Sequence, residues 1–150
     1  MRRVSVILCS YNSLNYLKDT LLNIYEQDYK NIEVIVKDGG SNDGTQELLE
    51  KFEKKFEHDK KRLIWKSARD GGIYDAMNQG FQLSSGEVIV FFNDLFLKNN
   101  AISTMMKVLE RHWEEYIGCH ADLIYTTKWM DARASYLVFE KECISKIWIV

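Results

Sequence analysis

The chain has 150 residues, of which 46% are apolar and 28% are charged. These proportions are typical of one globular domain with a real core, and they exclude a disordered or fibrous protein. Twenty basic residues against 22 acidic residues give a formal net charge of -2, so we expect no general electrostatic binding of nucleic acid. The apolar runs are all shorter than the roughly 18 residues that a membrane span needs.

Cysteine usage indicates a reducing compartment. The three cysteines, Cys9, Cys119 and Cys143, are odd in number and far apart in sequence. This pattern favours free thiols over a disulfide framework, and it excludes a CxxC-type zinc site. The first residues are interpreted as the start of a strand and not as a signal peptide. We therefore expect a cytoplasmic protein.

Four short apolar runs alternate with four helical patterns. Strands are predicted over residues 4–9, 32–36, 62–66 and 88–92. Apolar residues at helical spacing predict helices within residues 14–25, 48–56, 74–81 and 102–113. Asn15 is a candidate cap for the first helix, and weaker strands are predicted over residues 122–125 and 136–139. This order predicts an α/β domain with a mainly parallel sheet and helices on both faces.

Polar clusters follow each of the four main strands, at residues 10–13, 38–44, 67–72 and 93–94. In a parallel sheet the ligand crevice lies beyond the carboxyl ends of the strands. The four clusters are therefore expected to converge on one site.

The loop at residues 38–44 fails the EF-hand template and lacks the glycine pattern of a dinucleotide fingerprint. Asp43 is a candidate helix cap there. Asp38 differs, because it ends a strand and precedes two glycines that allow a ligand to approach the backbone closely. Its carboxylate could accept hydrogen bonds from a sugar hydroxyl or a base imide N–H.

Two further polar segments have alternative interpretations. Asn93 and Asp94 suit a turn with a helix cap, or a hard-cation ligand that needs a diphosphate to complete its shell. Residues 70–78 lead from a loop into a helix, whose apolar members Tyr74, Met77 and Phe81 are expected in the core. The polar residues of this segment are Asp70, Asp75 and Asn78.

Five ordered motifs resemble those of the family 2 glycosyltransferases of the GT-A fold. They are VSVILCSYNS at residues 4–13, QDYKNIE at 27–33, VKDGGSNDGT at 36–45, the segment 70–80, and SGEVI at 85–89. The resemblance covers about residues 1–110. It implies a Rossmann-like, mainly parallel sheet flanked by helices, in a single GT-A-like domain over residues 1–150 whose C-terminal acceptor part is missing or shortened.

The resemblance also implies a function, which is transfer of a sugar from a nucleotide-diphosphate-sugar donor to a glycan or lipid-linked acceptor. It implies a Mn²⁺ or Mg²⁺ ion with Asp94 as its ligand. Because one carboxylate and the Asn93 amide make a poor cage for a hard cation, we expect this ion to bind weakly and only with the nucleotide. Carried over by position, the residues expected to bind the nucleotide are Ser10, Tyr11, Asn12, Asp38, Gly39, Asp70 and Asn78. Tyr11 would stack near the base, and Asp38 would hydrogen-bond the base or the ribose.

Three departures from the family pattern keep a second hypothesis open. Asp94 stands where the family usually has two adjacent carboxylates, Met77 stands where many relatives carry a basic residue, and the family's general-base motif has no clear match. The alternative is a nucleotide-sugar-binding module without transferase activity, and the catalytic residues stay unassigned. The motif order disfavours a purely structural domain. Peripheral association with the inner face of a membrane, and self-association through the apolar residues 147–150, are left open.

Overall fold

The computed structural model describes residues 1–114, 118–127 and 130–140, with side chains described for residues 1–114. In chain order the elements are β1 (Val4–Ser10), α1 (Leu14–Tyr25), β2 (Ile32–Asp38), α2 (Thr45–His58), β3 (Arg62–Ser67), α3 (Ile73–Leu83), β4 (Val88–Phe91), α4 (Ala101–Arg111), β5 (Gly118–Thr127) and β6 (Met130–Glu140). The predicted alternation of four strands with four helices is confirmed. In this described part, no helix is long and apolar enough to cross a membrane.

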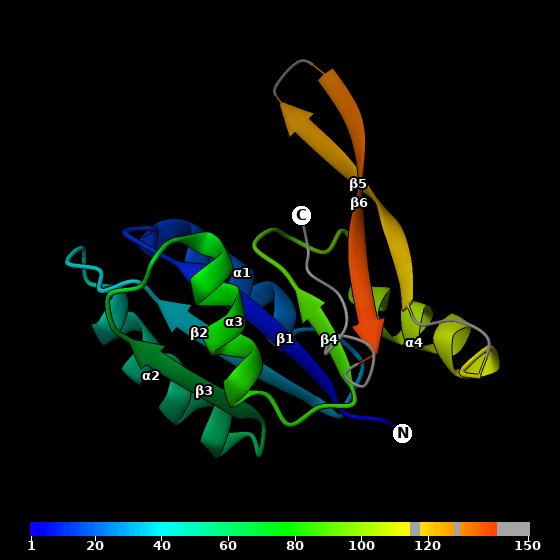
Figure 1. The fold of residues 1–150 in the computed structure, drawn as a ribbon, viewed down its shortest axis with the longest axis horizontal. Helices are drawn as coiled ribbons and strands as arrows, with labels where there is room; N and C mark the ends of the chain where they lie inside the picture. The colour runs from blue at the N-terminus through cyan, green and yellow to red at the C-terminus, as the bar shows by residue number, and fades with distance from the viewer. Residues whose placement is uncertain (115–117, 128–129, 141–150) are drawn as a thin grey trace.

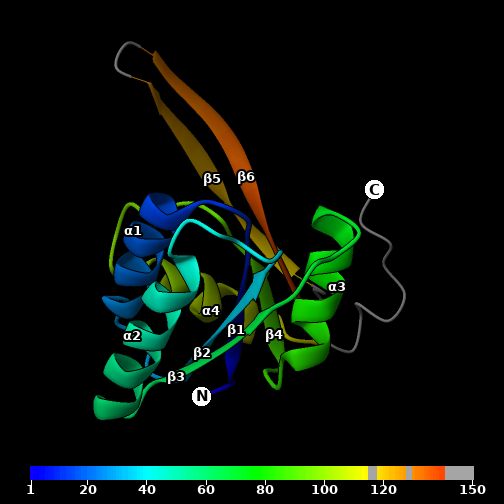
Figure 2. The same ribbon diagram turned by 90° about the vertical axis from the view of Figure 1, so that its left-hand side faces the viewer.

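The strands form one mixed sheet in the order β3-β2-β1-β4-β6-β5 (Figure 1). Strands β1 to β4 are parallel, as predicted. Strand β6 pairs antiparallel with β4, and β5 pairs antiparallel with β6. Only residues 88–90 of β4 pair with β6, so most of the β5–β6 hairpin extends away from the parallel sheet (Figures 1 and 2). The sequence indicated both hairpin strands but not their pairing or their length.

Helices cover both faces of the sheet (Figure 2). On one face, α1, α2 and α4 pack on alternate residues of the strands, which is the period expected of a strand. The buried residues of this layer include Val6, Leu8, Val34, Val36, Leu21, Leu49, Phe52, Ile102 and Leu109. The charged residues of α2 lie mostly on its exposed side, so the charge run from Glu47 to Arg62 forms a solvated surface.

On the opposite face, α3 is the one helix of the described part of the chain, and it packs on Ile7, Ile35 and Ile89. The helix lies close to β1 because Gly80 has no side chain, and a Cβ atom there would lie 2.6 Å from Ile7 Cγ2. The side of α3 that packs on the sheet is therefore Ala76 and Gly80, flanked by the partly buried Phe81.

Several local expectations are corrected. Ser13, and not Asn15, stands at the N-cap of α1, and Asn15 lies within the helix. Tyr74 is 59% exposed and is not a core residue, because the small residues of α3 face the sheet instead. Helix α4 begins at Ala101, so Asn93 and Asp94 cap no helix. The apolar residues 147–150 and Cys143 lie outside the described residues.

A buried carboxylate fixes the loop that connects α3 to β4. Glu33 of β2 is fully buried. It accepts hydrogen bonds from the Ser5 hydroxyl, the Ser85 hydroxyl at 2.7 Å and the Gly86 N–H at 3.0 Å. Burial raises the pKa of this carboxyl, but its hydrogen bonds from Ser5 and Ser85, together with Arg62, outweigh burial and hold the pKa below the ordinary value.

Candidate functional site

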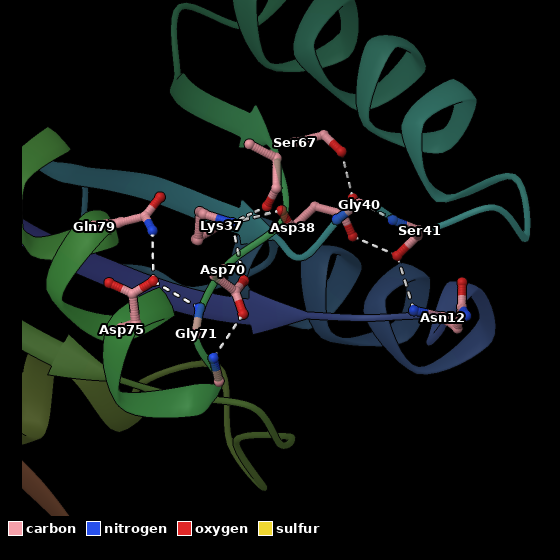
Figure 3. Close-up of polar contacts among 12 residues, drawn as sticks. Asn12, Lys37, Asp38, Gly40, Ser41, Ser67, Asp70, Gly71, Asp75 and Gln79 are labelled. Carbon is pink, nitrogen blue, oxygen red and sulfur yellow. Dashed lines mark hydrogen bonds and ion pairs between the residues drawn. The ribbon is translucent and has the colours of Figure 1, made fainter.

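The carboxyl ends of β1 to β4 lie at one edge of the sheet because these strands are parallel, and the polar clusters gather there (Figure 3). The loops after β1 and β2 are joined by their backbones, with the Gly39 N–H donating to the Ser10 carbonyl at 2.8 Å. The Ala68 N–H donates to the Asp38 carbonyl at 3.0 Å, which adds the loop after β3. The expected convergence of these loops is therefore present.

Asp38 faces inward and organises its own loop. Its side chain is fully buried, and the carboxylate accepts hydrogen bonds from the N–H groups of Gly40 at 3.1 Å and Ser41 at 2.9 Å (Figure 3). The hydroxyls of Ser41 and Ser67 also donate to it, Ser67 at 2.6 Å. Four donors nearly fill the acceptor capacity of a carboxylate. The geometry thus gives Asp38 a role in shaping the loop, with little capacity left for a ligand.

Ser10 and Asn12 also act within the loops. The Ser10 hydroxyl is buried and shares a hydrogen bond of 2.9 Å with the Ser13 hydroxyl. Asn12 adopts the left-handed backbone conformation, with φ at 47°. Its N–H donates to the Ser41 hydroxyl at 2.8 Å, and its side-chain oxygen accepts from the Asn42 N–H at 3.0 Å. Both residues hold the loop after β1 against the loop after β2.

Tyr11, Gly39 and Asp70 form the solvent-facing part of the site. A Cβ atom on Gly39 would lie 3.2 Å from Asp70 Oδ2 and 3.2 Å from Tyr11 Cδ2, so Gly39 lies between these two side chains. The Tyr11 side chain is 67% exposed. An exposed aromatic ring therefore stands beside a carboxylate, with bare backbone between them.

Asp70 is held from two sides (Figure 3). Its Oδ2 accepts a hydrogen bond from Lys37 Nζ at 3.0 Å, and its Oδ1 accepts one from the Gly72 N–H at 3.0 Å. The side chain keeps 14% of its surface exposed. The hydrogen bond from Lys37 and then the one from Gly72 lower the pKa of the Asp70 carboxyl below its ordinary value. Asp70 is thus an ionised acceptor at neutral pH.

Lys37 is the site residue that sequence reasoning missed. The lysine is fully buried, and its ammonium also donates to the carbonyls of Asp38 at 2.7 Å and Ala68 at 2.6 Å. The predicted strand ended at Val36, so Lys37 fell outside every element. A signal was available, since a lysine that continues a strand buried on both faces needs a charged or carbonyl partner in a neighbouring loop.

Residues at the start of α3 are ordered by a second aspartate. Asp75 Oδ2 accepts hydrogen bonds from the Gly71 N–H at 2.8 Å and from Gln79 Nε2 at 2.9 Å (Figure 3). These bonds fix the turn between Asp70 and α3. Asn78 is exposed on α3, and the contacts described for residues 1–114 do not tie it to this group.

A pocket of about 300 Å³ adjoins Tyr11 on the α1 side of β1. Its lining consists of Leu8, Cys9, Tyr11, Ser13, Tyr16, Leu17, Thr20 and Asn93. Burial, and then the Asp70 charge, raise the pKa of the Cys9 thiol to about 11, so the thiol is neutral at neutral pH. The Asn93 side chain closes one wall by accepting a hydrogen bond from the Cys9 N–H at 3.0 Å.

The predicted metal ligand Asp94 lies in the loop after β4, where it is exposed. Its Oδ1 accepts a hydrogen bond from the Leu95 N–H at 3.1 Å. Among the residues described, no three His, Cys, Asp or Glu side chains group closely enough to hold a metal ion. A single exposed carboxylate fits only the mode in which a substrate diphosphate and waters supply the other ligands.

Asp43 joins the first turns of two helices. Its carboxylate accepts hydrogen bonds from the Leu14 N–H at 3.0 Å, which begins α1, and from the Thr45 N–H at 3.2 Å, which begins α2. Gly44 occupies the N-cap of α2, so Asp43 performs the role expected of a cap from one residue earlier. Asp43 therefore has a structural role, because it orders the beginnings of α1 and α2.

The chain is similar to known glycosyltransferases. The family profile described as Glycosyl transferase family 2 matches residues 5–146. An uncharacterized glycosyltransferase of Mycobacterium tuberculosis is 42% identical over 91 residues, which covers 60% of this chain and 32% of the relative. The GalNAc(5)-diNAcBac-PP-undecaprenol beta-1,3-glucosyltransferase of Campylobacter jejuni is 28% identical over 119 residues, which covers 79% of this chain and 38% of the relative. The chain thus spans about a third of the length of these relatives.

Among solved structures, the mannosyltransferase PcManGT from Pyrobaculum calidifontis, in complex with GDP-Man and Mn²⁺, matches with a TM-score of 0.66 and 29% identity. The match covers 72% of this chain and 32% of that protein. The expected glycosyltransferase fold is confirmed.

Proposed function

This chain belongs to glycosyl transferase family 2, and we propose that it binds the nucleoside-diphosphate-sugar donor of a glycosyltransferase that acts on a glycan or lipid-linked acceptor. The proposal is supported mainly by the convergence of Tyr11, Gly39 and Asp70 at the carboxyl edge of the parallel sheet. The similar Pyrobaculum protein binds a nucleotide sugar, and the similar Campylobacter protein is named for a lipid-linked acceptor.

In this proposal, the nucleoside lies against the exposed ring of Tyr11. Stacking of a base on an aromatic ring contributes roughly 1–3 kcal/mol. Asp70 is an ionised acceptor beside that ring, so it would accept hydrogen bonds from base N–H or ribose hydroxyl groups. Gly39 leaves the backbone between them open to the ligand.

Most of the other predicted nucleotide-binding residues would contribute indirectly, by holding the loops whose residues contact the nucleotide. Ser10, Asn12 and Asp38 hold the loops that carry Tyr11 and Gly39, because their polar groups already bond within those loops. Asn78 is exposed on α3, where it would be open to solvent and to a ligand. We retain all seven residues as the proposed nucleotide site, within a single domain over residues 1–150.

Asp94 would hold a Mn²⁺ or Mg²⁺ ion together with the donor diphosphate. Such an ion, once bound, stabilises the negative charge that develops on the leaving diphosphate during in-line displacement at the anomeric carbon. The chain's own part is to orient the nucleoside through Tyr11 and Asp70, so that the sugar projects toward the acceptor. A cytoplasmic location would suit the free thiols and a nucleotide-sugar donor.

Titration calorimetry of the 150-residue chain with UDP, GDP, ADP and CDP, with and without Mn²⁺, tests the proposal. Wild-type protein should bind at least one of these, and Tyr11→Ala should weaken that binding by about tenfold or more, as expected for a lost stacking contact. Asp19→Asn on the exposed side of α1 is the matched surface control and should bind like the wild type. Absence of binding by the wild type, or unchanged affinity in a folded Tyr11→Ala variant, would refute the proposal.

A further inference from the structure

Lys37 has an environment that is unusual for a lysine. It lies on β2 between its strand partners Cys9 of β1 and Lys66 of β3. Although Lys66 is exposed, the Lys37 side chain has no exposed surface. Lys37 and Ile35 are two residues apart in the same strand, so both side chains lie on the α3 face of the sheet.

The Lys37 ammonium has one acceptor for each of its three protons. These acceptors are the carbonyls of Asp38 and Ala68 and the carboxylate of Asp70. A buried ammonium without partners would lose its proton or destabilise the fold. The two carbonyls satisfy its hydrogen bonding, but only Asp70 balances its charge. Because Asp70 alone of these groups reaches the solvent-facing site, the ion pair connects the core to that site.

We propose that Lys37 is a positioning residue for the nucleotide: its buried ammonium binds the Asp70 carboxylate and holds it in place as a hydrogen-bond acceptor for the ligand. The proposal rests on the proposed nucleotide-binding function and goes beyond it by assigning a role to a residue that the ligand never touches. Lys37 would act only through Asp70.

Other charged and titratable groups lie around Asp70. They are Cys9 of β1, Tyr11 in the loop after β1, Asp38 of β2, Arg69 in the same loop as Asp70, and Asp75 of α3. The Cys9 thiol is neutral, since its pKa is raised to about 11. Asp38 and Asp75 each carry their own donors from the loop backbone. Lys37 remains the main cause that lowers the pKa of Asp70, ahead of the Gly72 N–H.

The sign of the pH effect follows from this balance. With Lys37 present, the pKa of Asp70 lies below its ordinary value, so the carboxylate stays ionised throughout the neutral and mildly acidic range. Without Lys37, burial opposes ionisation and only the Gly72 N–H favours it, so the pKa should rise. A protonated Asp70 accepts poorly from a base N–H, and therefore ligand binding should weaken as the pH falls.

The test uses UDP-glucose and GDP-mannose as probes, because their diphosphates are esterified at both ends and do not titrate near neutrality. Affinity is measured from about pH 7 to about pH 4, a range whose acid end reaches the ordinary pKa of an aspartate, about 3.9. The variants are Lys37→Met, Lys37→Gln, Asp70→Asn and the double variant Lys37→Met/Asp70→Asn. Lys37→Gln keeps N–H donors for the two carbonyls but removes the charge, so it replaces Lys37→Met as the test variant if Lys37→Met fails to fold.

We expect wild-type affinity to stay nearly constant across this range, and the neutral Lys37 variants to lose about twofold to threefold at its acid end, where an aspartate of ordinary pKa begins to protonate. The double variant should bind weakly but with a flat profile, because the amide that replaces the Asp70 carboxylate cannot titrate. Two results would overturn the proposal: a flat profile in a folded Lys37→Met or Lys37→Gln variant, or a steep profile in the double variant. A wild-type chain that binds neither these probes nor any of UDP, GDP, ADP and CDP would refute the proposed function itself, which is a separate outcome.

Discussion

Glu33 and Lys37 lie on the same face of β2, both fully buried, and they hold opposite ends of α3. Glu33 accepts hydrogen bonds from the loop that leaves the helix, at Ser85 and Gly86. Lys37 donates to the loop that enters it, at Ala68 and Asp70. One strand thus fixes both ends of the helix with opposite charges, and only the Lys37 end borders the candidate site.

Glu33→Ala should destabilise the fold by about 1–3 kcal/mol, the range for leaving buried hydrogen-bond donors without an acceptor. The N–H of Gly86 and the Ser5 hydroxyl would lose their acceptor, and Arg62 would lose its carboxylate partner. Glu33→Gln keeps one acceptor oxygen and should destabilise the fold less than Glu33→Ala. Urea unfolding measures both changes.

The pH dependence of this stabilisation has a defined sign. The pKa of Glu33 is lowered in the folded state, so its ionised form contributes stability above the unfolded pKa. That contribution is lost as the pH falls through the folded pKa. The stability difference between the wild type and Glu33→Gln should therefore be constant near neutrality and shrink in acid. A difference that grows in acid would contradict this assignment.

Gly80→Ala should destabilise the protein even though alanine favours helix. Alanine is more favourable than glycine in a helix interior by about 1 kcal/mol. The new Cβ, however, would lie 2.6 Å from Ile7 Cγ2 and must push α3 off the sheet. Overpacking of this kind costs about 1–3 kcal/mol, so we expect a lower melting temperature. Gln82→Ala, at an exposed position of α3, should leave it almost unchanged.

Gly39→Ala should weaken nucleotide binding without unfolding the protein. Its Cβ would crowd Tyr11 and Asp70 at 3.2 Å each, and both side chains would have to shift. A loss of about 1 kcal/mol, or about fivefold in Kd, corresponds to one weakened contact. Gly71→Ala is the control, because its Cβ would meet Asp75 at an ordinary 3.6 Å. Equal affinities of the two variants would exclude the crowding argument.

The sequence predicted the four strand–helix units because buried strands and amphipathic helices leave strong periodic patterns. It did not predict the pairing of β5 and β6, since this depends on register between strands and not on the composition of either one. Tyr74 was misplaced for a related reason. Apolar spacing predicted its burial, but the close approach at Gly80 turned a different side of α3 to the sheet.

The sequence predicted the location of the site more accurately than it predicted the contacts of the site residues. Strand ends indicated which loops converge, but not which way each carboxylate points. The Asp38 carboxylate accepts hydrogen bonds from the N–H groups two and three residues later. The Asp-Gly-Gly-Ser order is compatible with this local turn, but it does not require it. Asp70 is bound by Lys37, and although a lysine that continues a buried strand indicates a partner in a neighbouring loop, it does not identify Asp70, 33 residues later, as that partner.

Asp94→Asn should abolish the effect of manganese on nucleotide binding and leave metal-free binding intact. Asp94 is a single exposed carboxylate, so it should bind Mn²⁺ measurably only when a diphosphate supplies further oxygens. Calorimetry with UDP in the presence and absence of Mn²⁺ measures the difference directly. Tight binding of Mn²⁺ to the protein without nucleotide would contradict the prediction, because it would require a cage of several ligands.

Sugar transfer by these 150 residues alone should be slow. An acceptor hydroxyl is a weak nucleophile, and a positioned general base contributes roughly 10²–10⁴-fold to its rate. The chain matches only about a third of the length of its relatives, and none of the carboxylates described for residues 1–114 stands free beside Tyr11 and Asp70 to serve as that base. The measurement is release of UDP or GDP from the bound donor with an added acceptor. Release at an ordinary enzymatic rate would place a base among Asp122, Asp131, Glu140 and Glu142, and single alanine substitutions would identify it, because only the true base should lower the rate without changing donor affinity.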